Sequence, residues 1–215
     1  FLEPLPKSKK MSGGAAISVK QINDETMHML ELAYENVNQA FGQLLQFSDK
    51  TDEQIYKRED TVNYLDKVIS EYISTALATP NLNVNISQAL SSYYLMLVDI
   101  ERISDYAVNM NHQATKRLQG DMTISEIEII EHMKKLCEDM KYDLDDVEEA
   151  ERKDDVIDSL VSSWREAQIQ ALKQKKCSSE VSMMLSRIFT DFERINDHAL
   201  NVSQELDKIT VEIPD

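Results

Sequence analysis

Residues 99–109 read DIERISDYAVN, and residues 191–201 read DFERINDHALN. Asp, Glu, Arg, Ile, Asp, Ala and Asn recur in the same order and at the same spacing in the two stretches. The chain therefore contains an internal repeat. A repeat of this kind indicates that one structural unit has been used twice.

Each copy of the motif lies within a run of apolar residues spaced three and four positions apart, which predicts an amphipathic helix with one apolar seam. The matching seam residues are Tyr93, Met96, Ile100, Ile103, Ala107, Met110 and Ala114 in the first copy and Leu185, Ile188, Phe192, Ile195, Ala199, Val202 and Leu206 in the second. At about 100° per residue, the polar motif positions point away from this seam. They form an acidic stripe on each helix: Glu101, Asp105 and Asn109, then Glu193, Asp197 and Asn201.

The composition favours an all-α protein. Gly and Pro occur only four times each in 215 residues, and hydrophobic residues make up 42%, which is enough for a packed core. The repeat also includes the helix before each motif, where Val62, Leu65, Ile69, Tyr72 and Ala76 match Ile157, Leu160, Trp164, Ala167 and Ala171. Three amphipathic helices per half predict two tandem three-helix bundles, with six long helices related by internal pseudo-symmetry.

The predicted organisation has four parts. Residues 1–16 form an irregular basic leader or linker, residues 17–119 the first bundle, residues 120–209 the second bundle and residues 210–215 a tail. Helices are expected over about 17–47, from near 51 to the Pro80 break, over 84–118, over 124–149, after the polar run 148–153, and over 178–209. Thr51-x-x-Gln54 and Thr123-x-x-Glu126 are expected to be capping boxes at two helix starts.

The overall charge excludes some classes of function. A formal net charge of −16 repels nucleic acid, and no basic and aromatic cluster offsets it. Cys137 and Cys177 are too few for a disulfide framework, which favours a reducing, cytoplasmic setting. The sequence contains no apolar run of the roughly 18 residues that a transmembrane helix needs.

The two motifs resemble those of the PhoU proteins, which are built as two three-helix bundles with repeated Glu/Asp-x-x-x-Asp motifs. The matching pairs are Glu101 with Asp105 and Glu193 with Asp197, each within Glu-Arg-Ile-x-Asp-x-Ala-x-Asn. Family members add a second acidic pair on the preceding helix, which Asp154-x-x-x-Asp158 fits. The first half departs from the family pattern, because its equivalent pair is Glu59-x-x-x-Asn63, with a neutral amide.

The resemblance implies metal sites on the bundle surface. The implied ligands are Asp154, Asp158, Glu193 and Asp197 in the second half and Glu59, Asn63, Glu101 and Asp105 in the first. Carboxylates one helical turn apart can share a cation, and oxygen ligands favour Mg²⁺, Mn²⁺, Ca²⁺ or oxidised iron. The resemblance implies multinuclear iron or zinc clusters at these positions.

The leader suggests a more specific relative. Phe1-Leu2-Glu3-Pro4 ahead of a first helix looks like the join between the membrane part and the PhoU-like C-terminal region of bacterial sodium/phosphate cotransporters. Lys7, Lys9 and Lys10 form the one dense basic group of this acidic chain, and basic residues beside a membrane exit favour the cytoplasmic side. The expected partner is therefore the membrane domain of a phosphate transporter, in cis or in trans, at the inner face of the cell membrane. Whether the chain also forms a homo-oligomer stays open.

Three classes of function are in view at this stage. The first is a regulatory domain that acts on phosphate transport without catalysing a reaction, since the sequence has no nucleophile with an adjacent base and no phosphate-binding Gly-rich loop. The second is a ferritin-like di-metal redox protein, and the third is a plain helical scaffold. Glu25-x-x-His28 has the spacing of a di-iron motif, but that site needs two copies and only one is present.

Overall fold

The computed structural model describes residues 14–114, 121–141, 144 and 146–209. These residues form six α-helices and no β-strand: α1 (Gly14–Leu45), α2 (Asp49–Leu77), α3 (Val84–Gln113), α5 (Ile124–Lys141), α6 (Val147–Lys173) and α7 (Ser179–Asp207). The all-α prediction is confirmed. No helix of the described residues is both long enough and apolar enough to cross a membrane.

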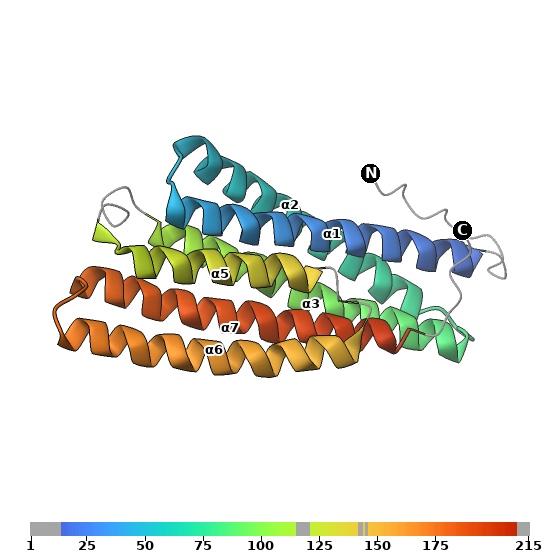
Figure 1. The fold of residues 1–215 in the computed structure, drawn as a ribbon. Helices are drawn as coiled ribbons and strands as arrows, with labels where there is room; N and C mark the ends of the chain where they lie inside the picture. Colours follow the sequence, from blue (N-terminus) through green and yellow to red (C-terminus); the bar gives the residue numbers. More distant parts are fainter. Residues whose placement is uncertain (1–13, 115–120, 142–143, 145, 210–215) are drawn as a thin grey trace.

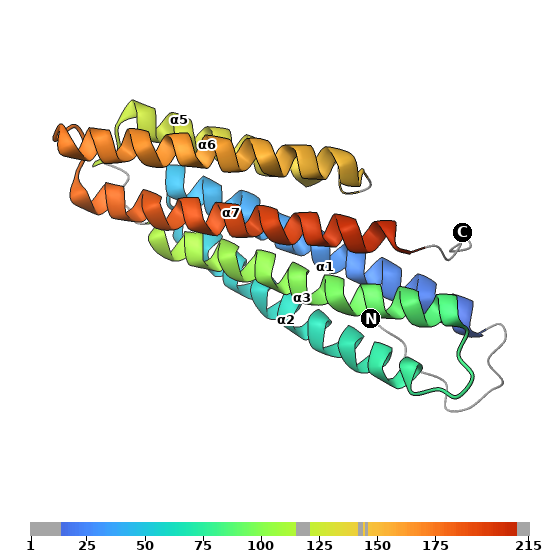
Figure 2. The same cartoon turned by 90° about the horizontal axis from the view of Figure 1, so that it is seen from below.

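The six helices form two groups of three that lie side by side (Figure 1). α1, α2 and α3 contact one another, and so do α5, α6 and α7. The groups meet where α3 packs against α7 and α1 packs against α5. Figure 2 shows that α3 and α7, the two helices that carry the repeated motif, run next to each other in opposite directions.

The predicted seams of α3 and α7 form the centre of the core. Both consist almost wholly of buried residues, with Leu206 at the end of α7 partly buried. Phe41 of α1 packs edge-on against Phe192 of α7, with ring centroids 6.3 Å apart. This contact joins the two groups, and buried residues of all six helices belong to one connected hydrophobic cluster.

Several helix ends differ from the prediction. α1 begins at Gly14, three residues before the predicted start, and α3 ends at Gln113 because Ala114 adopts extended backbone. α5 ends at Lys141, so the junction with α6 precedes the polar run 148–153. The side chain of Asp146 accepts the backbone N–H of Glu149 and thereby starts α6. The predicted boundary at Gly120 lies outside the described residues.

The two predicted capping boxes have different outcomes. Ser48, rather than Thr51 with Gln54, caps α2, because its hydroxyl accepts the N–H of Thr51. The Thr123–Glu126 box is confirmed. The Glu126 carboxylate accepts the backbone N–H of Thr123 at 2.7 Å, and the Thr123 hydroxyl accepts the N–H of Glu126 at 3.4 Å.

Glu126 gives a test of this helix start. It is buried and also accepts a hydrogen bond at 3.1 Å from the amide of Gln168 on α6, so one carboxylate both caps α5 and ties it to α6. We expect Glu126→Ala to lower the free energy of unfolding by about 2 kcal/mol, because it removes the carboxylate acceptor of the buried Gln168 amide and of a backbone N–H at the helix start. Urea denaturation followed by circular dichroism measures this. The exposed Glu128 on the same helix is the control, and a Glu128→Ala variant that is equally destabilised would contradict the prediction.

Candidate functional site: two acidic patches

The structure brings the predicted residues of the first half together on one surface of α2 and α3. We call Glu59, Asn63, Glu101 and Asp105 the first patch. Burial raises the pKa of the Glu101 carboxyl, and the negative charges of Asp105, Asp66 and Glu59 raise it further, while Arg102 lowers it. Each of these carboxylates therefore lies near Glu101. Asp66 of α2 is an addition that the sequence analysis missed.

Glu59 is the innermost member of the first patch, with only 8% of its surface exposed. Its carboxylate accepts hydrogen bonds from the hydroxyl of Ser104 on α3 and, at 3.0 Å, from the amide of Asn63. Ser104 in turn accepts a hydrogen bond at 3.0 Å from Asn36 of α1. Burial raises the pKa of Glu59, whereas the Ser104 hydrogen bond opposes this shift. The carboxylate is thus part of a polar network that joins all three helices.

In the second half, Asp154, Asp158 and Asp197 lie together between α6 and α7, and Glu193, one helical turn before Asp197, pairs with Arg165. We call Asp154, Asp158, Glu193 and Asp197 the second patch. Burial raises the pKa of Asp154, and the charges of Asp158 and Asp197 add to the shift. The amide of Asn196 donates a hydrogen bond to the Asp154 carboxylate.

Asn196 and Ser104 occupy the same position of the repeated motif, namely the variable residue in Glu-Arg-Ile-x-Asp. Both are buried, and each donates to the patch carboxylate of the preceding helix, Ser104 to Glu59 and Asn196 to Asp154. The variable position therefore anchors each patch. The motif did not predict this role, although the polar character of the position in both copies was a usable signal.

Arginine side chains pair with most of the outer carboxylates. Arg165 of α6 contacts Glu193 at 2.5 Å and also lies over the Phe189 ring, 5.7 Å from its centroid. The motif arginines each pair with the aspartate three residues later, Arg194 with Asp197 at 3.3 Å and Arg102 with Asp105 at 3.4 Å; Arg102 also lies 3.7 Å from Glu101. The two patches differ at two matched positions. Ser70 of α2 occupies the position of Arg165 in α6, and Val161 of α6 occupies the position of Asp66 in α2.

The first patch is consequently the more negative of the two. Asn63 makes it the weaker match to the family pattern, yet Asp66 restores a carboxylate and the uncharged Ser70 occupies the position of Arg165. Within the part of the chain that the structure describes, no group of three or more Asp, Glu, His or Cys side chains is arranged as metal ligands are. Carboxylate oxygens suit a hard cation. In this structure, however, the carboxylates of Glu193 and Asp197 pair with arginines.

A third polar cluster joins the two halves. Asp99 of α3, the first residue of the motif, contacts Nδ1 of His198 on α7 at 2.7 Å and accepts a hydrogen bond from Asn201 at 3.0 Å. The Tyr106 ring stacks on His198 with centroids 5.8 Å apart. This contact was not predicted, because nothing local in the sequence indicates a partner about a hundred residues away.

The other histidine-containing candidate remains isolated. Glu25 and His28 lie on α1, and His28 is exposed. His112 packs against Tyr56, and His132 packs against Trp164. The four histidines of the chain are thus dispersed over separate surroundings.

Two three-helix bundles joined through their motif helices, each with an acidic patch anchored by a buried polar residue, define a duplicated helical protein of the PhoU type. The chain belongs to the PhoU domain family, which matches residues 26–114 and 127–206.

A relative from Thermotoga maritima, named "Phosphate-specific transport system accessory protein PhoU homolog 1", is 22% identical over 197 residues, which is 86% of this chain and 84% of that protein. Two solved structures share the fold at 18% identity. The crystal structure of PhoU from Pseudomonas aeruginosa has a TM-score of 0.78, covering 90% of this chain and 97% of that one. That of the phosphate transport system regulatory protein PhoU from Streptococcus pneumoniae has a TM-score of 0.75, covering 94% and 99%.

A carboxyl group on α7 yields a pH prediction. Burial raises the pKa of Asp191 on α7 to about 6, while Arg187 lowers it. A carboxyl with a raised pKa in the folded state contributes stability that is fully present below the ordinary pKa of about 3.8 and is lost as the pH rises through about 6. We expect Asp191→Asn, which mimics the neutral acid, to melt at a higher temperature than the parent at pH 8 and at a similar temperature at pH 4.

Thermal melts at several pH values between 4 and 8 measure this difference. Asp155→Asn, at an exposed position of α6, is the matched control and should not show the same dependence on pH. If the difference between Asp191→Asn and the parent is constant over the whole pH range, Asp191 does not titrate as expected.

Proposed function

We propose that this chain is a non-enzymatic regulatory domain that acts on phosphate transport. The observation that carries the proposal is the family match across both halves, together with the duplicated patches. The Thermotoga maritima relative is named as an accessory protein of a phosphate-specific transport system. A regulatory protein of this kind works by binding a partner, which agrees with functional residues that lie on helix surfaces rather than around a reaction centre.

The proposed partner is the membrane domain of a phosphate transporter, reached in cis or in trans from the cytoplasmic side of the membrane. A sodium/phosphate cotransporter is our specific candidate. Its support is the basic group Lys7, Lys9 and Lys10 in an otherwise acidic chain, because cationic residues near a membrane face are attracted to anionic lipid headgroups. These lysines lie outside the described residues.

Metal binding at the patches stays a prediction. An iron, zinc or magnesium-like ion would have to draw the outer carboxylates away from Arg165, Arg194 and Arg102. Glu59 and Asp154 already accept hydrogen bonds, which hold them in fixed positions. The first patch is the better candidate for a metal site. Its outer carboxylates, Glu101 and Asp105, lie beside a single arginine, Arg102, and Asp66 adds a further carboxylate.

The test of this proposal measures both phosphate uptake and the metal content of the protein. In cells that carry the full-length gene product, we expect Glu101→Gln with Asp105→Asn to change how phosphate uptake responds to external phosphate, while helical content is retained because both side chains point away from the core. Phosphate uptake, circular dichroism and metal analysis of the purified protein are the measurements. If the first patch holds a metal, the double variant also loses it.

Glu71→Gln with Glu166→Gln removes two exposed charges from α2 and α6 and serves as the control. If the patch variant and the control respond to phosphate alike, the first patch is not the regulatory surface. If deleting residues 14–209 also leaves uptake unchanged, the regulatory proposal fails and the scaffold class is favoured.

A further inference from the structure

The first patch adjoins exposed apolar side chains on α3. Val98 lies about one helical turn before Glu101 and Tyr94 about two turns before it, so all three residues share one side of the helix. Tyr94 has 43% of its surface exposed and Val98 has 48%. The carboxylates of the first patch therefore lie directly beside apolar surface that is open to solvent.

In the second half, the matching positions bind a guanidinium group. Arg165 of α6 donates to the backbone carbonyl of Ser186 at 3.5 Å and to the hydroxyl of Thr190 at 3.1 Å. The same guanidinium pairs with Glu193 at 2.5 Å and lies over the ring of Phe189. Three acceptors and one aromatic ring of α7 thus contact this arginine. The duplicated helix face is therefore a guanidinium site wherever an arginine reaches it.

The first half retains the acidic partner but has no arginine at the matching position. Glu101 occupies the position of Glu193, and Ser70 occupies the position of Arg165. The Ser70 hydroxyl donates to the carboxylate of Asp66 at 3.5 Å, so α2 supplies a carboxylate here instead of a cation. Within the described part of α2, no basic side chain pairs with Glu101. The guanidinium position is consequently open in the first half.

The charges around this open position are unbalanced. Asp105, Asp66 and Glu59 all act on Glu101 as negative charges, and Arg102 of the same helix opposes them. Arg102 lies 3.7 Å from Glu101 and 3.4 Å from Asp105, so one exposed cation is shared by two carboxylates. A surface that gathers charge of one sign attracts groups of the opposite sign.

The neighbouring side chains select a guanidinium over a compact metal ion. A guanidinium is planar and weakly hydrated, and it stacks on aromatic rings, so it suits a carboxylate that adjoins apolar surface. Val98 and Leu97 replace the hydroxyl and the ring that contact Arg165 in the second half, whereas Tyr94 adds an exposed aromatic ring. A small ion such as Mg²⁺ retains its water molecules and gains nothing from these neighbours.

We propose that the first patch binds an arginine side chain of a partner protein, flanked in that partner by apolar residues. The guanidinium pairs with Glu101 and Asp66, in the place that Arg165 fills in the second half. The apolar neighbours of the arginine pack on Tyr94 and Val98. This assignment deepens the proposed function and rests on it for the identity of the partner, because it names the chemistry that a transport partner presents to the first patch.

A short capped peptide with arginine between two leucines is the probe, and NMR amide shifts of the purified chain are the measurement. We expect saturable shifts at Tyr94, Val98 and Glu101. Citrulline in place of arginine retains the shape without the charge and should weaken binding about fivefold or more, as should Glu101→Gln with Asp66→Asn. Ser70→Arg supplies a guanidinium from α2 itself and should block the peptide, whereas Ser70→Gln should not.

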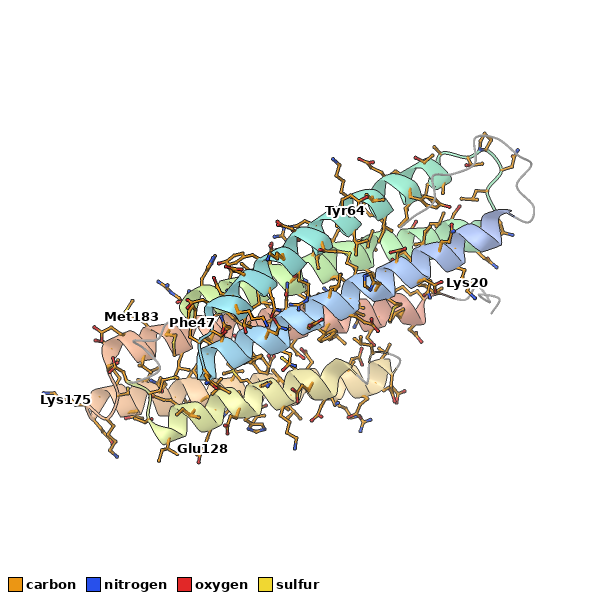
Figure 3. All side chains as sticks on the ribbon, turned by 90° about the horizontal axis from the view of Figure 1, so that it is seen from above. Lys20, Phe47, Tyr64, Glu128, Lys175 and Met183 are labelled. Carbon is orange, nitrogen blue, oxygen red and sulfur yellow. The ribbon has the colours of Figure 1, made fainter. Side chains whose placement is uncertain are left out.

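Glu53→Gln with Glu71→Gln is the matched control, since it removes the same charge from exposed positions of α2. These positions share the side of the helix that carries Tyr64, on the outer surface of α2 (Figure 3). Equal weakening by this control and by the Glu101–Asp66 pair would show diffuse attraction to an acidic chain and would overturn the proposal.

Three other results would also overturn the assignment: no saturable shift in the parent, equal affinity for the citrulline peptide, or an unchanged affinity in Ser70→Arg. The titration requires no phosphate transport, so its outcome is independent of the uptake experiment. If the peptide binds as expected while deletion of residues 14–209 leaves uptake unchanged, the arginine site stands and only the regulatory proposal fails.

Discussion

The packing of α3 against α7 is the contact on which the rest of the structure depends. Each of these helices contributes its apolar seam to its own bundle and also meets the other bundle, so the duplicated helix forms both a core and an interface. Polar contacts fix the relative placement of the pair, with Asp99 held by His198 and Asn201. Phe41 and Phe192 extend the contact to α1. The two halves therefore share one hydrophobic core, which neither half could complete alone.

The same two helices also position the acidic patches. Ser104 and Asn196 sit on the buried edge of their helices and donate to Glu59 and Asp154, so each patch is attached to the core through one hydrogen bond. Glu59 is buried and Asp154 is half-buried, so leaving either carboxylate without its donor costs more than losing a typical surface contact, which keeps the anchor in place. Among the outer carboxylates, Glu193 pairs with the half-buried Arg165, and Asp105 and Asp197 pair with the exposed Arg102 and Arg194, which they can exchange for other partners. A fixed inner residue with adjustable outer residues is a suitable arrangement for a surface that binds a partner.

Much of the fold could be predicted from the sequence because a period of three and four residues directly reports which side of a helix is buried. The seams around Ile100 and Ile195 were predicted this way, and Thr123 with Glu126 marked a helix start through a local pattern. The remaining features depend on contacts between distant segments. Arg165 pairs with Glu193 across two helices, and Asp99 pairs with His198 across the two halves. No local pattern encodes such pairs, so the charge of each patch could not be worked out before the helices were placed.

The most direct test of a shared core is to follow unfolding of the two halves with separate probes. Trp164, the one tryptophan of the chain, lies in α6 against Phe189 and Phe192 and reports on the second half through its fluorescence. Circular dichroism reports on all helices. We expect both signals to change at the same urea concentration, and Ile100→Ala in α3 to destabilise both by about 3 kcal/mol. Two separate transitions, with the Trp164 signal unaffected by Ile100→Ala, would contradict a shared core.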